Sequence, residues 1–395
     1  MQSIRCSNLS RRIFAAFVLI ITIVLALLPQ NERLFSGLSS DSISYERGIV
    51  TAVLEENLTP SDLKGGQMLG DQIVAISMNN GETVQVTNYL TDTHNILAEE
   101  GLRVVVCVDA PQGVEPYYTL YQYDRTTGVA VILGVFLLLM LLVGGEKGFS
   151  AALALAFSMV FLIRVTIPAI YEGGSPLAAG LVAVLLATSV TIFLLYGFVL
   201  RGGLAVVVTL AGEGLACFLF LLFSTLLHLT GFQSSDAESL LVAAGNTGMD
   251  LSTVLFAATM IASLGAVMDV AVSLLSALWE VHETDPALPG KRLFTSGMHI
   301  GRDMIGTMSN TLVFAFAGGS LTTILVLIAY GTQPNQLLHS DYVALELAQG
   351  LCGTCAVILT VPLASLAAAL VFPELQNSRK DSVVYKSNSK KGEKA

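Results

Sequence analysis

The chain has 395 residues, of which 53% are hydrophobic and only 13% charged, and its mean hydropathy is +0.70. Soluble domains carry about a quarter charged residues, and they do not need apolar runs long enough to cross a bilayer. The composition therefore excludes an ordinary soluble protein and predicts an α-helical polytopic membrane protein. The net charge of −10 says little by itself, because the charges are unevenly distributed along the chain.

About eight apolar stretches are long enough to be membrane helices. The first follows Arg5, Arg11 and Arg12, and no small-residue cleavage site follows it. We therefore interpret it as an uncleaved anchor helix, with a cleaved signal peptide as the alternative. The expected spans are 13–28, 128–143, 149–170, 177–200, 204–230, 251–281, 308–330 and 344–372.

The distribution of basic residues predicts which side of the membrane each loop occupies. With residues 1–12 in the cytoplasm, the basic tail 374–395 is also cytoplasmic, and residues 29–127 lie outside. The short outer loops 171–176, 232–250 and 331–341 then contain no Lys or Arg. We expect a multi-pass protein of the cytoplasmic membrane, in contact with the lipid bilayer, whose basic tail serves as a topology signal with affinity for anionic headgroups.

Residues 29–127 are expected to form a small external β-barrel-like domain of the OB or SH3 kind. Five stretches alternate in hydrophobicity as strands do, and Asn80-Gly81 between the second and third predicts a type I′ hairpin turn. The domain has 14 acidic and 5 basic residues between positions 29 and 126, which argues against nucleic acid as a partner. No catalytic arrangement is visible in it, so we expect a rigid cap or a docking module.

Asp269 in the sixth span is the sharpest candidate for a functional group, because charged residues inside the membrane are costly. Helical spacing places it on a stripe of small, polar and acidic residues, with an apolar face opposite that suits lipid or apolar neighbours. The stripe predicts a path for protons or ions; the alternative is an aspartate capped by hydroxyls and simply packed. The stripe comprises Ala258, Ala262, Gly265, Asp269, Ser273, Ser276 and Glu280, and the opposite face Met260, Leu264, Val267, Leu274 and Leu278.

A second polar stripe runs through "GMHIGRDMIGTMSNTLVFAFAGGSL", residues 297–321. If this stretch is helical from about Met298, one face carries His299, Asp303, Thr307, Asn310 and Phe314. One short loop separates it from the sixth span, so the two stripes are expected to face each other.

The oxygen atoms of Asp269, Asp303, Thr307 and Asn310 could then bind a cation or relay protons, with Ser309 lining the path. Arg302 either pairs with a carboxylate or sets the topology.

Three further features fall inside or beside the spans. Glu213, in the fifth span, is expected to assist the two aspartates. Arg164 is expected either to reach outward to Glu172 or to pair with an acid in the bundle. Cys352 and Cys355 form a C-x-x-C inside an apolar run, where small-residue packing of helices is a better explanation than a redox or metal site.

The motifs of several enzyme classes are missing from the sequence. We find no Walker motif, no H-E-x-x-H, and no pattern of the intramembrane aspartyl or serine proteases. We therefore do not expect an enzyme, and no cofactor is implied.

The run "GAVMDVAVSLLSAL", followed by residues 296–321, resembles the YibE/F-like family of bacterial multi-pass membrane proteins. The resemblance covers roughly residues 40–373, and the β segment after a first helix is similar to the longer, YibE-type members. It implies a transport role without a firmly established substrate, and a heteromeric complex with a YibF-like subunit. Matching positions of the family motif are Asp269, Arg302, Asp303, Thr307, Ser309 and Asn310.

Taken together, the sequence predicts a secondary transporter or permease of a small solute or ion, with seven spans in 128–373. Asp269 and Asp303 would bind a coupling proton or cation. The rivals are an assembly or scaffold protein that docks an extracytoplasmic partner, and a passive channel. The chain could pair with a YibF-like subunit or form a homo-oligomer.

Overall fold

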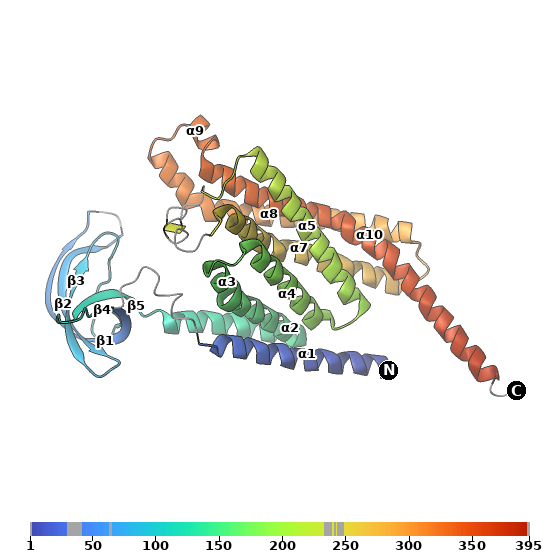
Figure 1. Ribbon diagram of the computed structural model, residues 1–395, viewed down its shortest axis with the longest axis horizontal. Coiled ribbons are helices and arrows are strands. Elements are labelled where there is room, and N and C mark those ends of the chain that lie inside the picture. The colour runs from blue at the N-terminus through green and yellow to red at the C-terminus, as the bar shows by residue number, and fades with distance from the viewer. Residues whose placement is uncertain are drawn as a thin grey trace. The chain divides into compact units, whose positions relative to one another are not determined.

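The structure is a computed structural model that describes residues 2–29, 42–62, 65–232, 239–240, 242 and 249–392. Two compact units divide the chain: residues Met1–Gln30 with Gly144–Ala395, and residues Asn31–Val143. Most of the predicted outer loop 232–250 and the start of the predicted external domain lie outside the described residues. We call the first the helical unit and the second the β unit, and Figure 1 shows their elements.

The helical unit contains long apolar helices, as the hydropathy predicts. Seven helices in the described part of the chain are long and apolar enough to cross a membrane. The helical elements are α1 (Gln2–Leu27), α2 (Thr126–Phe161), a π-helical turn (Leu162–Thr166), α3 (Ile167–Tyr171), α4 (Pro176–Tyr196), α5 (Leu200–Leu226), α7 (Leu251–Thr284), α8 (Gly290–Ala329), α9 (Pro334–Leu338) and α10 (Asp341–Gly392).

Two of the expected spans, 128–143 and 149–170, fall in one apolar stretch, Thr126–Tyr171. The backbone leaves the helical conformation at Gly145, where φ is 53° and ψ is −132°. Only glycine adopts such a conformation without strain, so the chain breaks within the loop that the sequence predicts between the two spans.

Helix α8 begins 18 residues before the expected start of its span at 308, because residues 290–307 are also helical. Its 40 residues extend about 60 Å at 1.5 Å per residue, roughly twice the thickness of a bilayer's hydrocarbon core. The polar stretch 297–307 is therefore an integral part of a long helix, rather than a loop that leads into one.

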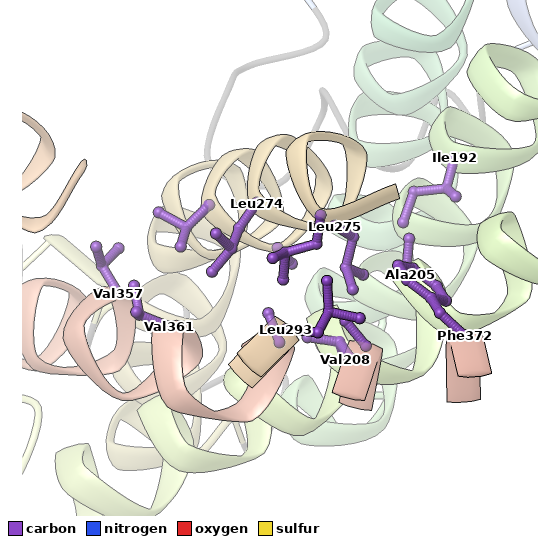
Figure 2. Packing of buried hydrophobic residues seen from close by; sticks show 14 residues of the cluster. Ile192, Ala205, Val208, Leu274, Leu275, Leu293, Val357, Val361 and Phe372 are labelled. Atoms are coloured by element: carbon purple, nitrogen blue, oxygen red, sulfur yellow. The ribbon is translucent and has the colours of Figure 1, made fainter. Parts of the chain in front are cut away.

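Helix α10 lies at the centre of the helical unit and packs against α5, α7 and α8. Figure 2 shows the apolar side chains that fill this contact, including Leu274 of α7, Leu293 of α8 and Val361 of α10, all three fully buried. Small residues set the spacing between the helices. A Cβ atom on Gly301 of α8 would lie 2.2 Å from Cγ1 of Val361, so the glycine lets the two backbones approach closely.

Helix α1 is held to the rest of the helical unit by arginine contacts near its middle and at its C-terminal end. Arg11 and Arg12 contact the carboxylate of Glu146 at 3.0 and 3.3 Å.

At the C-terminal end of α1, the guanidinium group of Arg164 donates to the backbone carbonyls of Leu25 (3.1 Å), Ala26 (2.9 Å) and Leu28. The last carbonyls of a helix have no partner within the helix, and a basic side chain satisfies them well. The sequence predicted Glu172 or an acid in the bundle as the partner of Arg164, and it did not predict the contact with these backbone carbonyls. The arginine serves as a cap for α1.

The β unit confirms the five strands expected from the alternation of its residues. They are β1 (Ile43–Pro60), β2 (Met68–Met78), β3 (Thr83–Leu90), β4 (Arg103–Asp109) and β5 (Tyr117–Tyr123). They form one antiparallel sheet in the order β3-β2-β1-β4-β5. The edge strands β3 and β5 also approach each other, so the sheet curls into a half-barrel around a buried apolar core.

The predicted hairpin joins β2 and β3, but its turn is not of type I′. Met78 N donates to Glu82 O at 2.8 Å, which leaves Asn79, Asn80 and Gly81 as a three-residue loop. Only Gly81 has a positive φ, 89°, whereas type I′ requires two such residues. The Oδ1 atom of Asn80 accepts from the Glu82 N–H at 2.9 Å, so the asparagine stabilises the turn through its side chain.

Two buried amides, Gln72 and Asn88, attach the segment between β3 and β4 to the sheet. Asn88 Nδ2 donates to the carbonyl of Ile96 at 2.7 Å, and Gln72 Oε1 accepts from the N–H of Ala98 at 2.9 Å. These bonds satisfy backbone groups that the half-barrel buries. They explain how a segment without helix or strand closes one side of the core.

Candidate functional site

The most deeply buried charged residue in the described part of the chain is Glu213, at the midpoint of the 27-residue helix α5. Its side chain is only 2% exposed. The hydroxyl of Ser263 on α7 donates to Oε1 at 2.7 Å, whereas Oε2 has no hydrogen-bond partner among the described residues. A buried carboxylate without a counter-charge is costly, and an unpaired oxygen in a membrane helix indicates a functional group.

A close approach of three helices creates the surroundings of Glu213. A Cβ atom on the preceding residue, Gly212, would lie 2.5 Å from Oγ1 of Thr360 on α10 and 2.7 Å from Cγ1 of Val267 on α7. Any larger residue would push these helices apart. The glycine therefore allows α5, α7 and α10 to surround the carboxyl group.

A series of polar side chains leads from α10 toward Glu213. Gln349 of α10 donates through Nε2 to Oγ1 of Thr259 at 3.2 Å. Thr259 lies one turn before Ser263 on α7, and the Ser263 hydroxyl is 3.0 Å from the Thr259 carbonyl oxygen as well as 2.7 Å from Glu213. This polar row, Gln349–Thr259–Ser263–Glu213, connects a half-buried amide to the buried carboxyl group.

The polar row borders a narrow crevice between α5 and α7, which is too small to hold a water molecule. Its other walls are apolar or weakly polar: Ala216, Cys217, Phe220, Phe256 and Met260. One turn before Glu213, the buried hydroxyl of Thr209 lacks a hydrogen-bond partner among the described residues. The two residues share a face of α5, so the polar surface extends along the helix.

Cys352 takes part in the packing of α10 against α5. It is fully buried, and its Sγ atom donates to the carbonyl of Ala216 on α5 at 2.9 Å. Cys355 is a free thiol one turn further along α10. Nowhere in the described residues do three His, Cys, Asp or Glu side chains gather as ligands for a metal ion.

The orientation of α7 differs from the one expected from the sequence. The apolar face that seemed suited to lipid, with Met260, Val267 and Leu278, is buried against neighbouring helices. The stripe with Asp269 and Glu280 is exposed on the surface of the chain. Apolar residues pack against protein as well as against lipid, so hydrophobicity alone does not decide which face of a membrane helix points inward.

Helix α8 shows the same orientation. Its buried face consists of Leu293, Gly297, Gly301 and Ser320, and the glycines pack against Ser365 and Val361 of α10. The polar stripe of α8 is exposed at Arg302, Asp303, Thr307 and Asn310, while Ser309 is half-buried and its Oγ has no hydrogen-bond partner within the described chain. Gly297 and Gly301 thus serve packing, and Arg302 and Asp303 are exposed.

The two stripes lie on adjacent antiparallel helices. A loop of five residues, 285–289, joins α7 to α8, and a Cβ on Gly297 would lie 3.0 Å from Cδ1 of Leu278. Asp269 precedes Leu278 by nine residues and Gly306 follows Gly297 by nine, so both lie about 13 Å along their helices from this contact. The polar residues of α7 and α8 therefore occupy similar depths on the outer surface of the helical unit.

The sequence reasoning missed three members of the polar row: Thr259, Ser263 and Gln349. Thr259 and Ser263 lie beside the predicted stripe of α7, on the face expected to be apolar. Gln349 was the strongest missed signal, because an amide inside an apolar run needs a partner.

Comparison with known proteins places these features in a family. No curated protein and no solved structure matches the chain. The family model of the YibE/F-like protein matches residues 132–374, which is more than half of the chain and includes Glu213, Asp269 and the polar stripe of α8. The β unit lies almost wholly outside the matched residues. The chain is thus a membrane protein that belongs to the YibE/F-like family.

Proposed function

We propose that this protein is a secondary transporter in which Glu213 takes up and releases the coupling ion. The observation that carries the proposal is a carboxyl group at the middle of a membrane helix, 2% exposed, with one oxygen unpaired in the described chain. Transporters bind substrates and coupling ions near the bilayer midplane, where acidic residues in membrane helices form proton relays.

A proton suits this site better than a metal cation. Glu213 has one hydroxyl neighbour, Ser263, and no second carboxylate to complete a cation's shell among the described residues. Hard cations prefer six or more oxygen ligands. Uptake of a proton removes the buried charge, and Ser263 remains as a hydrogen-bond partner in both states.

Asp269 and Asp303 could bind a coupling ion only if another subunit covers them. Both are exposed on the isolated chain, so they do not line a path within it. Their roles as coupling residues stay predictions. The alternative to a transporter is a passive channel, which would show flux that neither saturates nor depends on a proton gradient.

The test is proton flux into proteoliposomes, followed with an internal pH dye while a panel of ions, amino acids and small metabolites is added. Glu213→Gln preserves the shape of the side chain but cannot ionise, so solute-dependent proton movement should disappear. Glu280→Gln makes the same chemical change at an exposed position of α7 and should retain it. Full coupled flux in Glu213→Gln would refute the proposal.

The exposed stripes of α7 and α8 favour a second function, the assembly of a membrane complex. Asp269, Asp303 and Asn310 are costly to expose to lipid, and another helical subunit would cover them. Either a second copy of the chain or a YibF-like subunit fits this requirement. Under this function, Asp269→Asn dissociates the complex, measured by size in detergent, and leaves no solute-specific defect.

The location in the cytoplasmic membrane, with both ends in the cytoplasm, is part of the same proposal. Single cysteines placed at Ser10 and at Glu115 of the β unit would test it with a membrane-impermeant thiol reagent on intact cells. The variant with cysteine at position 115 should react and the variant with cysteine at position 10 should not. The reverse labelling pattern would show that the topology is opposite to the one proposed.

A further inference from the structure

The β unit contains an open pocket of about 680 Å³ where the sheet meets the beginning of α2. The polar residues of its lining are Tyr45, Arg47, Asp124, Arg125 and Thr126. The apolar residues of its lining, which we call the apolar side, are Val105, Val129, Ala130 and Leu133. The last three of these residues belong to α2, so the apolar side coincides with the start of a membrane-spanning stretch.

The positive charge of this unit gathers at the pocket. Residues 29–126 include five basic residues and 14 acidic ones; two of the five, Arg47 and Arg125, line the pocket, and a third, Arg103, lies beside it. Arg103 contacts Thr127 of α2 at 3.4 Å between Nη1 and Oγ1. In an acidic unit, such clustering at a single edge creates a local positive potential.

The one carboxylate in the pocket is engaged with the chain itself. Asp124 Oδ1 accepts from the N–H of Thr126 at 3.0 Å, at the beginning of α2. The bonds from Thr126 lower the pKa of Asp124, and Arg47 and Arg103 lower it further by their charge. The carboxylate therefore offsets one of three guanidinium charges, and the pocket remains positive.

Arg125 packs on an aromatic ring, and both lining arginines are open to solvent. Arg125 lies over the ring of Tyr123, with Cζ 5.9 Å from the ring centroid, and the rings of Tyr45 and Tyr121 pack with centroids 4.8 Å apart. Arg47 and Arg125 are both exposed. Guanidinium groups in this state bind phosphate well, because their planar donors match its oxygens.

We propose that this pocket binds an anionic phospholipid, with its headgroup phosphate on Arg47 and Arg125 and an acyl chain along Val129, Ala130 and Leu133. The apolar side distinguishes a lipid from a free anion, since soluble phosphate gains nothing from exposed Val129 and Leu133. A zwitterionic headgroup fits less well because its ammonium group is repelled by the arginines. The bound lipid would fix the β unit to the membrane surface where α2 enters it.

The first experiment measures lipid binding to the purified full-length protein by native mass spectrometry. Phosphatidylglycerol and phosphatidylcholine with identical acyl chains are titrated separately, and inorganic phosphate is added as a soluble competitor. We expect tighter binding of phosphatidylglycerol. Each of Arg47→Gln and Arg125→Gln should weaken that binding about fivefold, because a basic residue at an anionic lipid surface contributes about 1 kcal/mol.

Arg201→Gln is the matched control. Arg201 is also an exposed arginine over an aromatic ring, with Cζ 5.5 Å from the ring centroid of Tyr196, but it lies outside the β unit. This variant should keep the preference for phosphatidylglycerol. A second measurement uses phosphatidylglycerol with a photoreactive acyl chain, which should label the region 129–133 in wild type and lose that label in Arg47→Gln/Arg125→Gln.

Three results of the lipid titrations would overturn the proposal. They are equal affinity for the two lipids, an unchanged preference in the double variant, and competition by inorganic phosphate at the affinity of the lipid. The last would show that the apolar side contributes nothing and that the site binds a free anion. Because the arginines are exposed, the variants are expected to fold. If a variant fails to fold, the photolabel on the wild-type protein still tests the site, and a label away from region 129–133 would refute it.

Discussion

The hydroxyl of Ser263 on α7 lies 2.7 Å from Oε1 of Glu213 on α5. Among the described residues, it is the hydrogen-bond donor to this buried carboxyl group. The bond joins two helices at the centre of the helical unit, where Gly212 permits their close approach. The hydrogen bonding of Glu213 within the described chain therefore depends on a single side chain fifty positions away in the sequence.

Ser263→Ala should destabilise the protein by about 1–3 kcal/mol, because it leaves both oxygens of a buried carboxyl group without a donor. Thermal unfolding in detergent measures the change. Ser273→Ala removes the same hydroxyl from an exposed position of the same helix and should have little effect. Equal melting temperatures for the two variants would show that the bond contributes nothing to stability.

The glycines of α8 provide a matched pair for testing its packing. Gly301→Ala should cost about 1–3 kcal/mol, since the new Cβ would lie 2.2 Å from Cγ1 of Val361. Gly306→Ala should be neutral or stabilising by up to about 1 kcal/mol, because nothing lies within 4 Å of its new Cβ. A melting temperature lowered equally by both substitutions would contradict the packing of α8 on α10.

Arg164→Gln should loosen the end of α1, because the carbonyls of Leu25 and Ala26 lose a charged donor. We expect a local cost of about 1–2 kcal/mol and faster hydrogen exchange at the last turn of α1, measured by mass spectrometry. Arg292→Gln, an exposed arginine of α8, is the control and should leave that turn unchanged. Unaltered exchange at Leu25–Leu28 in Arg164→Gln would argue against the cap.

The beginning of α2 should lose stability in acid. The Thr126 N–H bond holds the pKa of Asp124 below the ordinary aspartate value of about 3.9. The folded state thus binds its proton less readily than the unfolded state. The stabilisation is complete at pH values above 3.9 and falls as the pH drops through the lowered pKa.

Asp124→Ala should flatten this part of the acid profile, measured by thermal unfolding across a pH series. Asp92→Ala replaces an exposed aspartate of the same unit and should preserve the profile. A profile unchanged by Asp124→Ala would show that this carboxylate does not contribute.

The β strands could be predicted from the sequence because one buried face imposes strict alternation. The pattern of Ile73 to Met78 on β2, for instance, alternates between buried and half-buried positions. The turn type was wrong because it depends on the φ angle of Asn80, and the dipeptide Asn-Gly is compatible with two- and three-residue loops.

The positions of most spans could also be read from hydropathy, but their orientations could not. In α7 both faces are compatible with burial, and the contacts that decide between them come from α5 and α10. For the same reason Glu213 stood out less than Asp269: its hydrogen-bond partner, Ser263, lies on another helix. Local periodicity contains no information about such distant neighbours.

The separation of Glu213 and Ser263 also has a consequence for biosynthesis. Helix α5 is synthesised before α7, so at 5–20 residues per second the carboxyl group waits about 3–10 s for its donor fifty positions later. Gln349 arrives later still. During this interval α5 has an unsatisfied acid at its midpoint, and a bound proton would lower the cost of placing it in the bilayer.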